Sequence, residues 1–169
     1  MARLFVAVSP PEEVLDRIAA LCRPEVAGVR WTDRGQWHVT LRFLGRVDDL
    51  AAAAEALAGV RAAPTVASLG PTVGRFGHRV LHVPVAGLDA VAATVVAATA
   101  HVGEPPEERG FTGHLTLARV TGRARVDLRP LAGQPVVGTW PVEEVDLMES
   151  HLSPKGARYE TVERVALRH

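Results

Sequence analysis

Two short stretches of the sequence alternate apolar and polar residues, and both begin with the same kind of tetrapeptide. In the first, W-H-V-T-L-R-F-L-G (37–45), the apolar residues at 39, 41 and 43 fall on one face of a predicted strand. His38 and Thr40 fall on the other face, roughly 6 to 7 Å apart along the strand. The tetrapeptide returns as H-L-T-L at 114–117. An imidazole and a hydroxyl therefore face the same way twice, which predicts one site shared by the two copies.

The rest of the chain alternates between helix-like and strand-like patterns. Apolar residues recur at three- and four-residue intervals in three segments, which predicts helices that begin at Glu12, that follow Asp48 or Asp49, and that cover residues 88–101. A short helix is also expected near 127–131, in a loop-like stretch at 122–138. Short apolar runs bounded by Gly and Pro predict strands at 4–8, in pieces over 66–76, and at 80–85, 142–148 and 159–167.

The order of these elements repeats along the chain. Each half is predicted to run strand, helix, loop and then the H-x-T-L strand, and 33 residues separate Phe5 from His38 while 32 separate His82 from His114. Residues 1–77 and 78–169 therefore look like structural repeats of one another. A pseudo-two-fold arrangement of the repeats would bring the two motifs face to face. No long linker separates them, and 169 residues suit a single domain.

Composition limits the kinds of partner. The 19 basic and 19 acidic residues balance, so an extended nucleic-acid footprint is not expected and any phosphate recognition should be local. All basic residues but Lys155 are Arg, the side chain suited to bidentate phosphate contacts. The lone Cys22 excludes an internal disulfide and a Cys-based metal cluster. The apolar run near the amino terminus is too short for a signal peptide or a membrane span, so a soluble cytoplasmic protein is expected.

Paired imidazoles and hydroxyls indicate a reaction type. Imidazole titrates near pH 6.5, so at neutral pH one histidine can be a neutral base and the other a protonated acid without large pKa tuning. Two Thr hydroxyls can donate hydrogen bonds to the oxygens of an anion held between the rings. A phosphodiester fits, because the incoming oxygen loses a proton while the leaving oxygen gains one. Hydrolysis or transesterification of a phosphodiester, with no metal required, is the predicted reaction.

Each candidate residue also has a purely structural interpretation. His38 and His114 could be strand histidines with hydrogen bonds in the core, although the doubled pairing with Thr favours function. Arg42 shares the strand parity of His38 and Thr40, so it could contact substrate or could be a solvated strand-end residue. Arg119 has the opposite parity to His114. It reaches the same face only if the strand twists or bulges, and a structural ion pair is the alternative.

Other histidines and aromatic residues carry weaker signals. His78 and His82 have the spacing of helical metal ligands, but they lie in or beside a predicted strand, so no metal site is expected there. Trp31, Trp37 and Trp140 could stack on a nucleotide base, yet aromatic residues beside strands more often belong to the core.

Taken together, the motifs resemble those of the 2H phosphoesterases. The resemblance rests on the paired H-x-T-L motifs, on F-L-G (43–45), on A-R (118–119) and on the tail S-H-L-S-P-K-G-A-R-Y (150–159). Within that superfamily the chain is similar to the RNA 2′,3′-cyclic phosphodiesterases, also called 2′-5′ RNA ligase-like proteins, over nearly its whole length. Gly113 departs from the pattern, since the family often has Pro before the second His; this affects a loop and not the chemistry.

The resemblance implies an α+β fold, a two-lobed pseudo-symmetric repeat in which antiparallel sheets line a central cleft with helices on the outside. Residues 1–169 would form one such domain, with tail strands that could cross between the lobes. It also implies that a terminal 2′,3′-cyclic phosphate of RNA is opened to a 2′-phosphate. His38 would donate a proton to the leaving ribose oxygen and His114 would accept one from water.

The same resemblance completes the expected site and its surroundings. Thr40 and Thr116 join the catalytic set, and Arg42 and Arg119 are the candidate substrate-binding residues. No cofactor and no metal is expected, the partners are RNA ends or oligonucleotides with a terminal cyclic phosphate, and the protein should be a monomer without membrane association.

Two other functions remain open at this point. The same residues could join RNA halves through 2′-5′ bonds or cleave 2′-5′ oligonucleotides, because ligation is the reverse of cyclic-phosphate opening. The chain could also be a non-catalytic RNA- or nucleotide-binding module. Binding alone would not need two titrating groups, which counts against the module.

Overall fold

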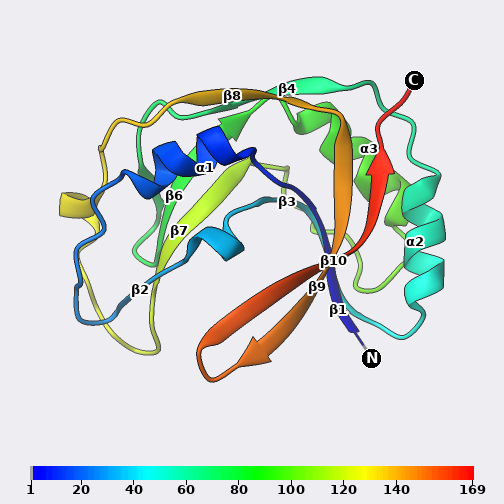
Figure 1. Cartoon of the computed structure of the whole chain (residues 1–169). Coiled ribbons are helices and arrows are strands. Elements are labelled where there is room, and N and C mark those ends of the chain that lie inside the picture. The colour runs from blue at the N-terminus through cyan, green and yellow to red at the C-terminus, as the bar shows by residue number, and fades with distance from the viewer. Residues whose placement is uncertain (1) are drawn as a thin grey trace.

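A single antiparallel sheet organises the fold. The computed structural model describes residues 2–169, and within them ten strands join in the order β10-β9-β1-β3-β7-β6-β4-β8, with β2 added beside β7 and β5 beside β6. Figure 1 shows this sheet curled into a half-barrel, with helices packed against it. The strands are β1 (Ala2–Val8), β2 (Val29–Trp31), β3 (Val39–Val47), β4 (Thr65–Leu69), β5 (Gly74–Phe76), β6 (Val80–Ala86), β7 (His114–Val120), β8 (Gly138–Val142), β9 (Glu144–Ser153) and β10 (Gly156–Ala166). The α+β class and the antiparallel pairing predicted from sequence are confirmed.

Three α-helices pack on the sheet: α1 (Glu12–Ala19), α2 (Leu50–Ala58) and α3 (Asp89–Thr99). Their apolar stripes supply the buried contacts, as Val14 and Ile18 do on α1. The side chain of Asp49 accepts a hydrogen bond from the backbone N–H of Ala52 at 3.0 Å, so the predicted N-cap of α2 is confirmed. Two 3₁₀ turns, η1 (Arg34–Gln36) and η2 (Arg129–Leu131), complete the helical elements. In the described part of the chain, no helix is long and apolar enough to cross a membrane.

Strand alternation divides the core from the opposite face of the sheet. On β1, Leu4, Val6 and Val8 enter the main hydrophobic core. Phe5 and Ala7 point to the other face, where they pack with Met148 of β9 in a separate small cluster. The side of the sheet that carries Phe5 is the side on which the functional groups gather.

Two arms of the sheet meet at one narrow junction. The strands β1, β9 and β10 extend from β3, and β6, β2 and β5 gather around β7. Between β3 and β7 a single residue pair, Val39 with Leu115, is in register. The arms do not coincide with residues 1–77 and 78–169, because β4 and β5 of the first half pair with β6 of the second. The tail joins both arms, since β8 pairs with β4 and the following β9 pairs with β1.

Candidate active site

The junction between β3 and β7 brings the two motifs together. Because these strands are antiparallel and Val39 lies opposite Leu115, His38 lies opposite Thr116, and Thr40 lies opposite His114. Directly opposed side chains have Cβ atoms roughly 4.5 to 5.5 Å apart and point to the same face. All four predicted catalytic side chains therefore share one face, related by a pseudo-two-fold axis through the Val39–Leu115 pair.

Around His38, hydrogen bonds define the state of the ring. Nδ1 lies 2.8 Å from the backbone oxygen of Gln36, and Nε2 lies 2.8 Å from Oγ1 of Thr40. A carbonyl oxygen only accepts, so Nδ1 carries the hydrogen and, in the neutral ring, Nε2 accepts from the Thr40 hydroxyl. Phe5 and Tyr159 enclose the ring, with centroid distances of 4.8 and 5.1 Å. The reactive Nε2 thus faces the shared surface beside Thr40.

His114 repeats this arrangement with different neighbours. Its Nδ1 lies 2.8 Å from the backbone oxygen of Thr112, which again directs Nε2 to the reaction. Phe76 stands edge-on at 4.9 Å, and His82 lies at 5.9 Å and stacks on Phe76 at 3.8 Å. By strand register His82, opposite Thr116, holds the position that Ala7 holds opposite Thr40, and Val80 corresponds to Phe5, so the rings beside His38 and His114 come from different positions.

Burial changes the acid–base behaviour of the site. Burial lowers the pKa of His38 to about 4, an effect that the positive charges of His114 and Arg119 reinforce and that the hydrogen bond to Gln36 opposes. Burial likewise lowers the pKa of His82 to about 4, and His114 adds to that effect. His38 is therefore neutral at pH 7 in the free protein. The expectation of one neutral and one protonated imidazole without large pKa tuning therefore does not hold with His38 as the protonated ring.

A β-bulge in β7 brings Arg119 to the functional face. Thr116 pairs with His82, and Arg119 pairs with Val80, so three steps on β7 match two steps on β6. His82 and Val80 are two residues apart and share a face, so Thr116 and Arg119 do as well. The bulge that Arg119 needs in order to reach the face of His114 is therefore present. Burial raises the pKa of Tyr159, and the charge of Arg119 opposes that rise. Arg119 is thus close enough to affect the pKa of both His38 and Tyr159.

An equivalent bulge in β3 removes Arg42 from that face. Thr40 pairs with Ala7, Arg42 with Val6 and Phe43 with Phe5, so the side chain of Arg42 turns toward the core while Phe43 takes the functional face. Arg42 is only 5% exposed. The simple parity argument for Arg42 is wrong for this reason.

The guanidinium of Arg42 has a structural role. It donates hydrogen bonds to the backbone oxygens of Phe43 at 2.8 Å and Glu104 at 2.7 Å, and longer ones to Thr99 and Val102 at 3.4 and 3.2 Å. Thr99 is the last residue of α3, so Arg42 satisfies carbonyls at the negative end of that helix. These contacts leave it unsuited to binding substrate, and Arg42 is not part of the site that we propose.

Other sequence candidates lie elsewhere. Trp37 and Trp140 are buried in the core, so neither is free to stack on a base, and Trp31 is half-buried and donates to the backbone oxygen of Pro24 at 2.8 Å. His78 is exposed. Tyr159 is a site residue that no sequence pattern singled out, apart from its place at the end of the tail motif.

Two surface cavities lie away from His38 and His114. One, of about 450 Å³, is bordered by the end of β3 and the loop after α3, including Arg46 and Glu104. The other, of about 300 Å³, is lined by Arg17 and the segment from Pro135 to Val137. The paired motifs therefore belong to the face of the sheet and not to either cavity.

Comparison with known proteins tests the resemblance. The family model described as "2'-5' RNA ligase superfamily" matches residues 5–154 of the chain. The chain belongs to this superfamily. Its members are 2H phosphoesterases, and the match includes both H-x-T-L motifs.

Individual relatives of this superfamily agree in sequence and in fold. An RNA 2′,3′-cyclic phosphodiesterase of Aeropyrum pernix is 32% identical, over 76% of this chain and 81% of the relative. The crystal structure of TT0787 of Thermus thermophilus is 32% identical with a TM-score of 0.77 and covers 98% of both chains. E. coli LigT complexed with 3′-AMP is 25% identical with a TM-score of 0.78 and covers 99% of both chains. These likenesses support a phosphoesterase activity of the 2H type.

Proposed function

We propose that this protein hydrolyses the 2′,3′-cyclic phosphate at RNA ends to a 2′-phosphate. The observation that carries the proposal is the register of β3 and β7, which places His38, Thr40, His114 and Thr116 on one face. An acid and a base on opposite sides of one phosphorus meet the needs of an in-line displacement. The A. pernix relative named as an RNA 2′,3′-cyclic phosphodiesterase supports the choice of substrate.

The proposed reaction balances with two proton transfers. A water oxygen attacks the phosphorus while Nε2 of His114 accepts the proton of that water. The bond between phosphorus and the ribose 3′-oxygen breaks, and His38 donates a proton to this leaving oxygen. The products are a 2′-phosphate and a 3′-hydroxyl. The hydroxyls of Thr40 and Thr116 donate hydrogen bonds to the non-bridging oxygens.

The surroundings of the rings support this division of roles. His38 is enclosed by Phe5 and Tyr159, so its proton is shielded from bulk water and directed at the substrate. A pKa of about 4 makes protonated His38 a stronger acid than an ordinary imidazolium. The negative charge of the bound phosphodiester raises that pKa, so substrate binding is coupled to proton uptake at His38.

The direct experiment uses a short RNA that ends in a 2′,3′-cyclic phosphate. We expect the purified protein to convert it to the 2′-phosphate, mapped by chromatography against 2′- and 3′-phosphate standards. Replacing His38 or His114 by Gln should lower the rate on the order of 10² to 10⁴. A 3′-phosphate product, or binding of the RNA without turnover, would overturn the proposal.

A better leaving group separates the roles of the two histidines. A ribose alkoxide needs a proton to leave, whereas p-nitrophenolate does not. If a p-nitrophenyl phosphodiester binds with the nitrophenol in the leaving position, His38→Ala should damage its hydrolysis much less than that of the cyclic phosphate. His114→Ala should impair both substrates, because water still has to be activated. Rescue of His114→Ala instead would reverse the assignment.

The superfamily description also names 2′-5′ RNA ligation, which is the reverse of a related step at the same site. Attack by a 5′-hydroxyl of a second RNA, in place of water, would give a 2′-5′ bond with the same acid and base. Incubation of paired RNA halves, with and without the cyclic phosphate, measures this second activity beside hydrolysis.

A further inference from the structure

A pair of arginines adjoins the proposed site without acidic partners. Arg30 on β2 lies directly opposite Arg119 on β7, and both side chains are exposed. Like charges directly opposed across two strands are destabilising. Within residues 2–169 neither guanidinium has an ion-pair or hydrogen-bond partner. An uncompensated pair of cations at this position is suited to an anionic ligand.

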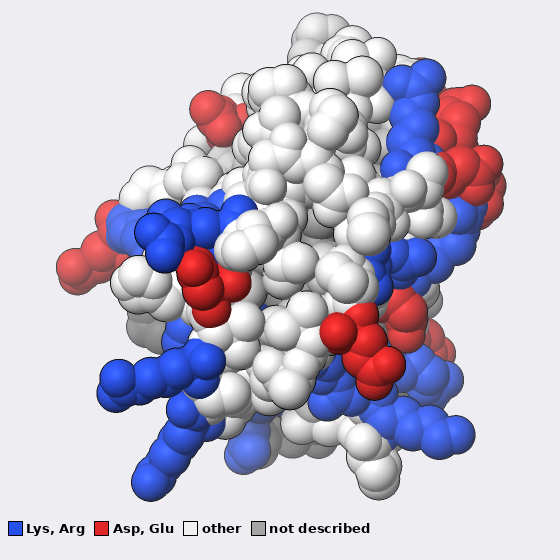
Figure 2. Space-filling model, turned by 90° about the vertical axis from the view of Figure 1, so that its left-hand side faces the viewer, with Lys and Arg blue, Asp and Glu red and all other residues white. Residues whose placement is uncertain are grey.

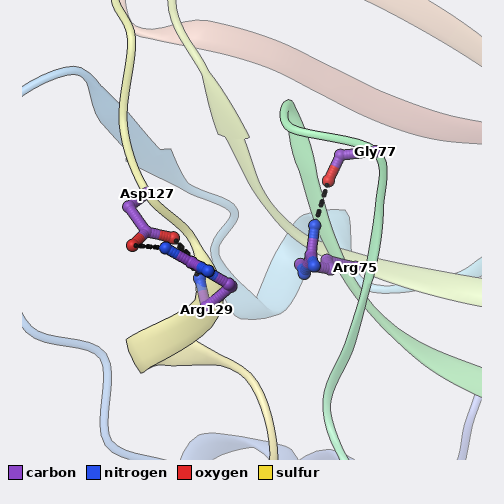
Figure 3. A network of polar contacts seen from close by, with 4 residues as sticks. All are labelled: Arg75, Gly77, Asp127 and Arg129. Atoms are coloured by element: carbon purple, nitrogen blue, oxygen red, sulfur yellow. Dashed lines mark hydrogen bonds and ion pairs between the residues drawn. The ribbon is translucent and has the colours of Figure 1, made fainter.

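Two other arginines, Arg75 on β5 and Arg129 on η2, are already engaged. Figure 3 shows Arg129 paired with Asp127, whose two oxygens lie 2.9 and 3.0 Å from its nitrogens, and Arg75 donating to the backbone oxygen of Gly77 at 3.0 Å. Figure 2, which faces the left-hand side of Figure 1, shows basic side chains projecting from the lower half of the molecule, with acidic ones among them. Arg30 and Arg119 differ from these two engaged arginines because their donors remain available.

The arginine pair lies at the His38 end of the functional face. Because of the bulge, Arg119 comes three residues after Thr116 but lies only two regular strand steps along the face, roughly 6 to 7 Å, and its charge reaches His38 and Tyr159. Arg30 extends toward the turn between β9 and β10, where its Nη2 would lie 2.6 Å from a Cβ on Gly156. Gly156, at φ +112°, therefore leaves the room that this guanidinium occupies.

We infer that Arg30, together with Arg119, binds the phosphodiester that precedes the terminal nucleotide, so that the preferred substrate is an oligonucleotide end and not a mononucleotide. This inference rests on the proposed function, in which His38 protonates the ribose oxygen of the terminal nucleotide. The 5′-oxygen of that same ribose carries the preceding phosphate, so the strand continues past His38 toward the arginines. Beside His114, on the β5–β6 side of the face, Phe76 and His82 offer rings instead of positive charge.

Arginine is the side chain expected for this task. Its planar guanidinium makes paired hydrogen bonds to phosphate oxygens, and two of them can neutralise one phosphodiester. The chain has no net charge, so its affinity for a strand has to come from such local groups.

The test compares two substrates and two variants. The substrates are a cytidine 2′,3′-cyclic phosphate without a 5′-phosphate and a dinucleotide that ends in the same cyclic phosphate. We expect wild type to prefer the dinucleotide in kcat/KM, and Arg30→Gln to reduce that preference about tenfold, chiefly through KM. Arg125→Gln is the matched control: it removes one exposed charge from the loop that packs against Gly28, and the preference should stay unchanged.

Binding keeps the inference testable apart from catalysis. A fluorescent dinucleotide with a terminal 2′-phosphate should bind Arg30→Gln about tenfold more weakly than wild type, while the thermal melting temperatures agree. If wild type binds but does not hydrolyse, the proposed function fails and this comparison still decides the inference. If Arg30→Gln keeps the dinucleotide preference, or weakens both substrates equally, Arg30 does not bind the preceding phosphate and the inference is wrong.

Discussion

Acidification should destabilise the protein through His38, and the effect can be calculated. The pKa of His38 is about 4 in the folded protein, while an unfolded chain has the ordinary value near 6.5. Between these pH values the unfolded state binds more protons than the folded state. The contribution of His38 to the unfolding free energy is therefore complete above pH 6.5 and is lost as the pH falls toward 4. Lowering the pH from 7.5 to 5 should therefore reduce the unfolding free energy by about 2 kcal/mol through this single ring.

Urea unfolding of wild type and His38→Gln at the two pH values measures this contribution. The glutamine removes the titrating group and retains a polar side chain beside Gln36 and Thr40. Other groups, including His82 and the carboxylates, titrate in both proteins and cancel in the difference. We expect wild type to lose about 2 kcal/mol more than His38→Gln on acidification.

The control is His78→Gln, which removes an exposed imidazole. It should follow the wild-type pH dependence, whatever its absolute stability. Equal losses for wild type and His38→Gln would show that His38 accepts a proton in the folded state as readily as in the unfolded one. The argument from burial by Phe5 and Tyr159 would then be refuted.

Two further predictions concern metal and Arg42. Hydrolysis of the cyclic phosphate should survive excess EDTA, because the two imidazoles supply both proton transfers; loss of activity that added Mg²⁺, Mn²⁺ or Zn²⁺ restores would contradict this. The described cluster with metal-ligand spacing, Glu149, His151 and Glu160, lies on the side of β9 and β10 opposite Tyr159. Arg42→Met should lower the unfolding free energy on the order of 3 kcal/mol by leaving buried carbonyls unpaired, with KM unchanged. A large rise in KM without loss of stability would show that Arg42 contacts substrate.

Sequence patterns predicted the elements whose signals are local. The helices, the strand at β1, the strand at β6 and the N-cap at Asp49 follow from periodicity and from turn residues. β2 and β8 were missed, because three residues are too few to show a period, and because the Gly- and Pro-rich segment before β8 has the composition of a loop. β5 and β6 form a local hairpin, whereas the pairing of β4 with β8 joins residues distant in sequence, which periodicity does not report.

For the candidate site, the sequence predicts the direction of each side chain correctly as far as the bulges in β3 and β7. Side-chain direction alternates only while a strand stays regular, and one extra residue reverses it beyond that point. The two consecutive buried residues Leu117 and Ala118 are the trace that the bulge leaves in β7. In β3 the corresponding pair is Leu41 and Arg42, where a charged residue at the buried position hides the signal. Burial of His38 depends on Phe5 and Tyr159 from other strands, so its lowered pKa could not be predicted from the motif.

The two bulges place different side chains at equivalent positions of the two motif copies. Both occur one residue after the H-x-T triplet, so Phe43 in one copy and Arg119 in the other hold the same position relative to their histidine. The backbone is duplicated, but the chemistry at this position is not, since one arm presents a ring and the other a cation. A symmetric pair of imidazoles could receive a phosphodiester in either orientation. The unequal neighbours make the two orientations differ in energy. A strand with distinct 5′ and 3′ ends, such as RNA, therefore binds in one preferred orientation.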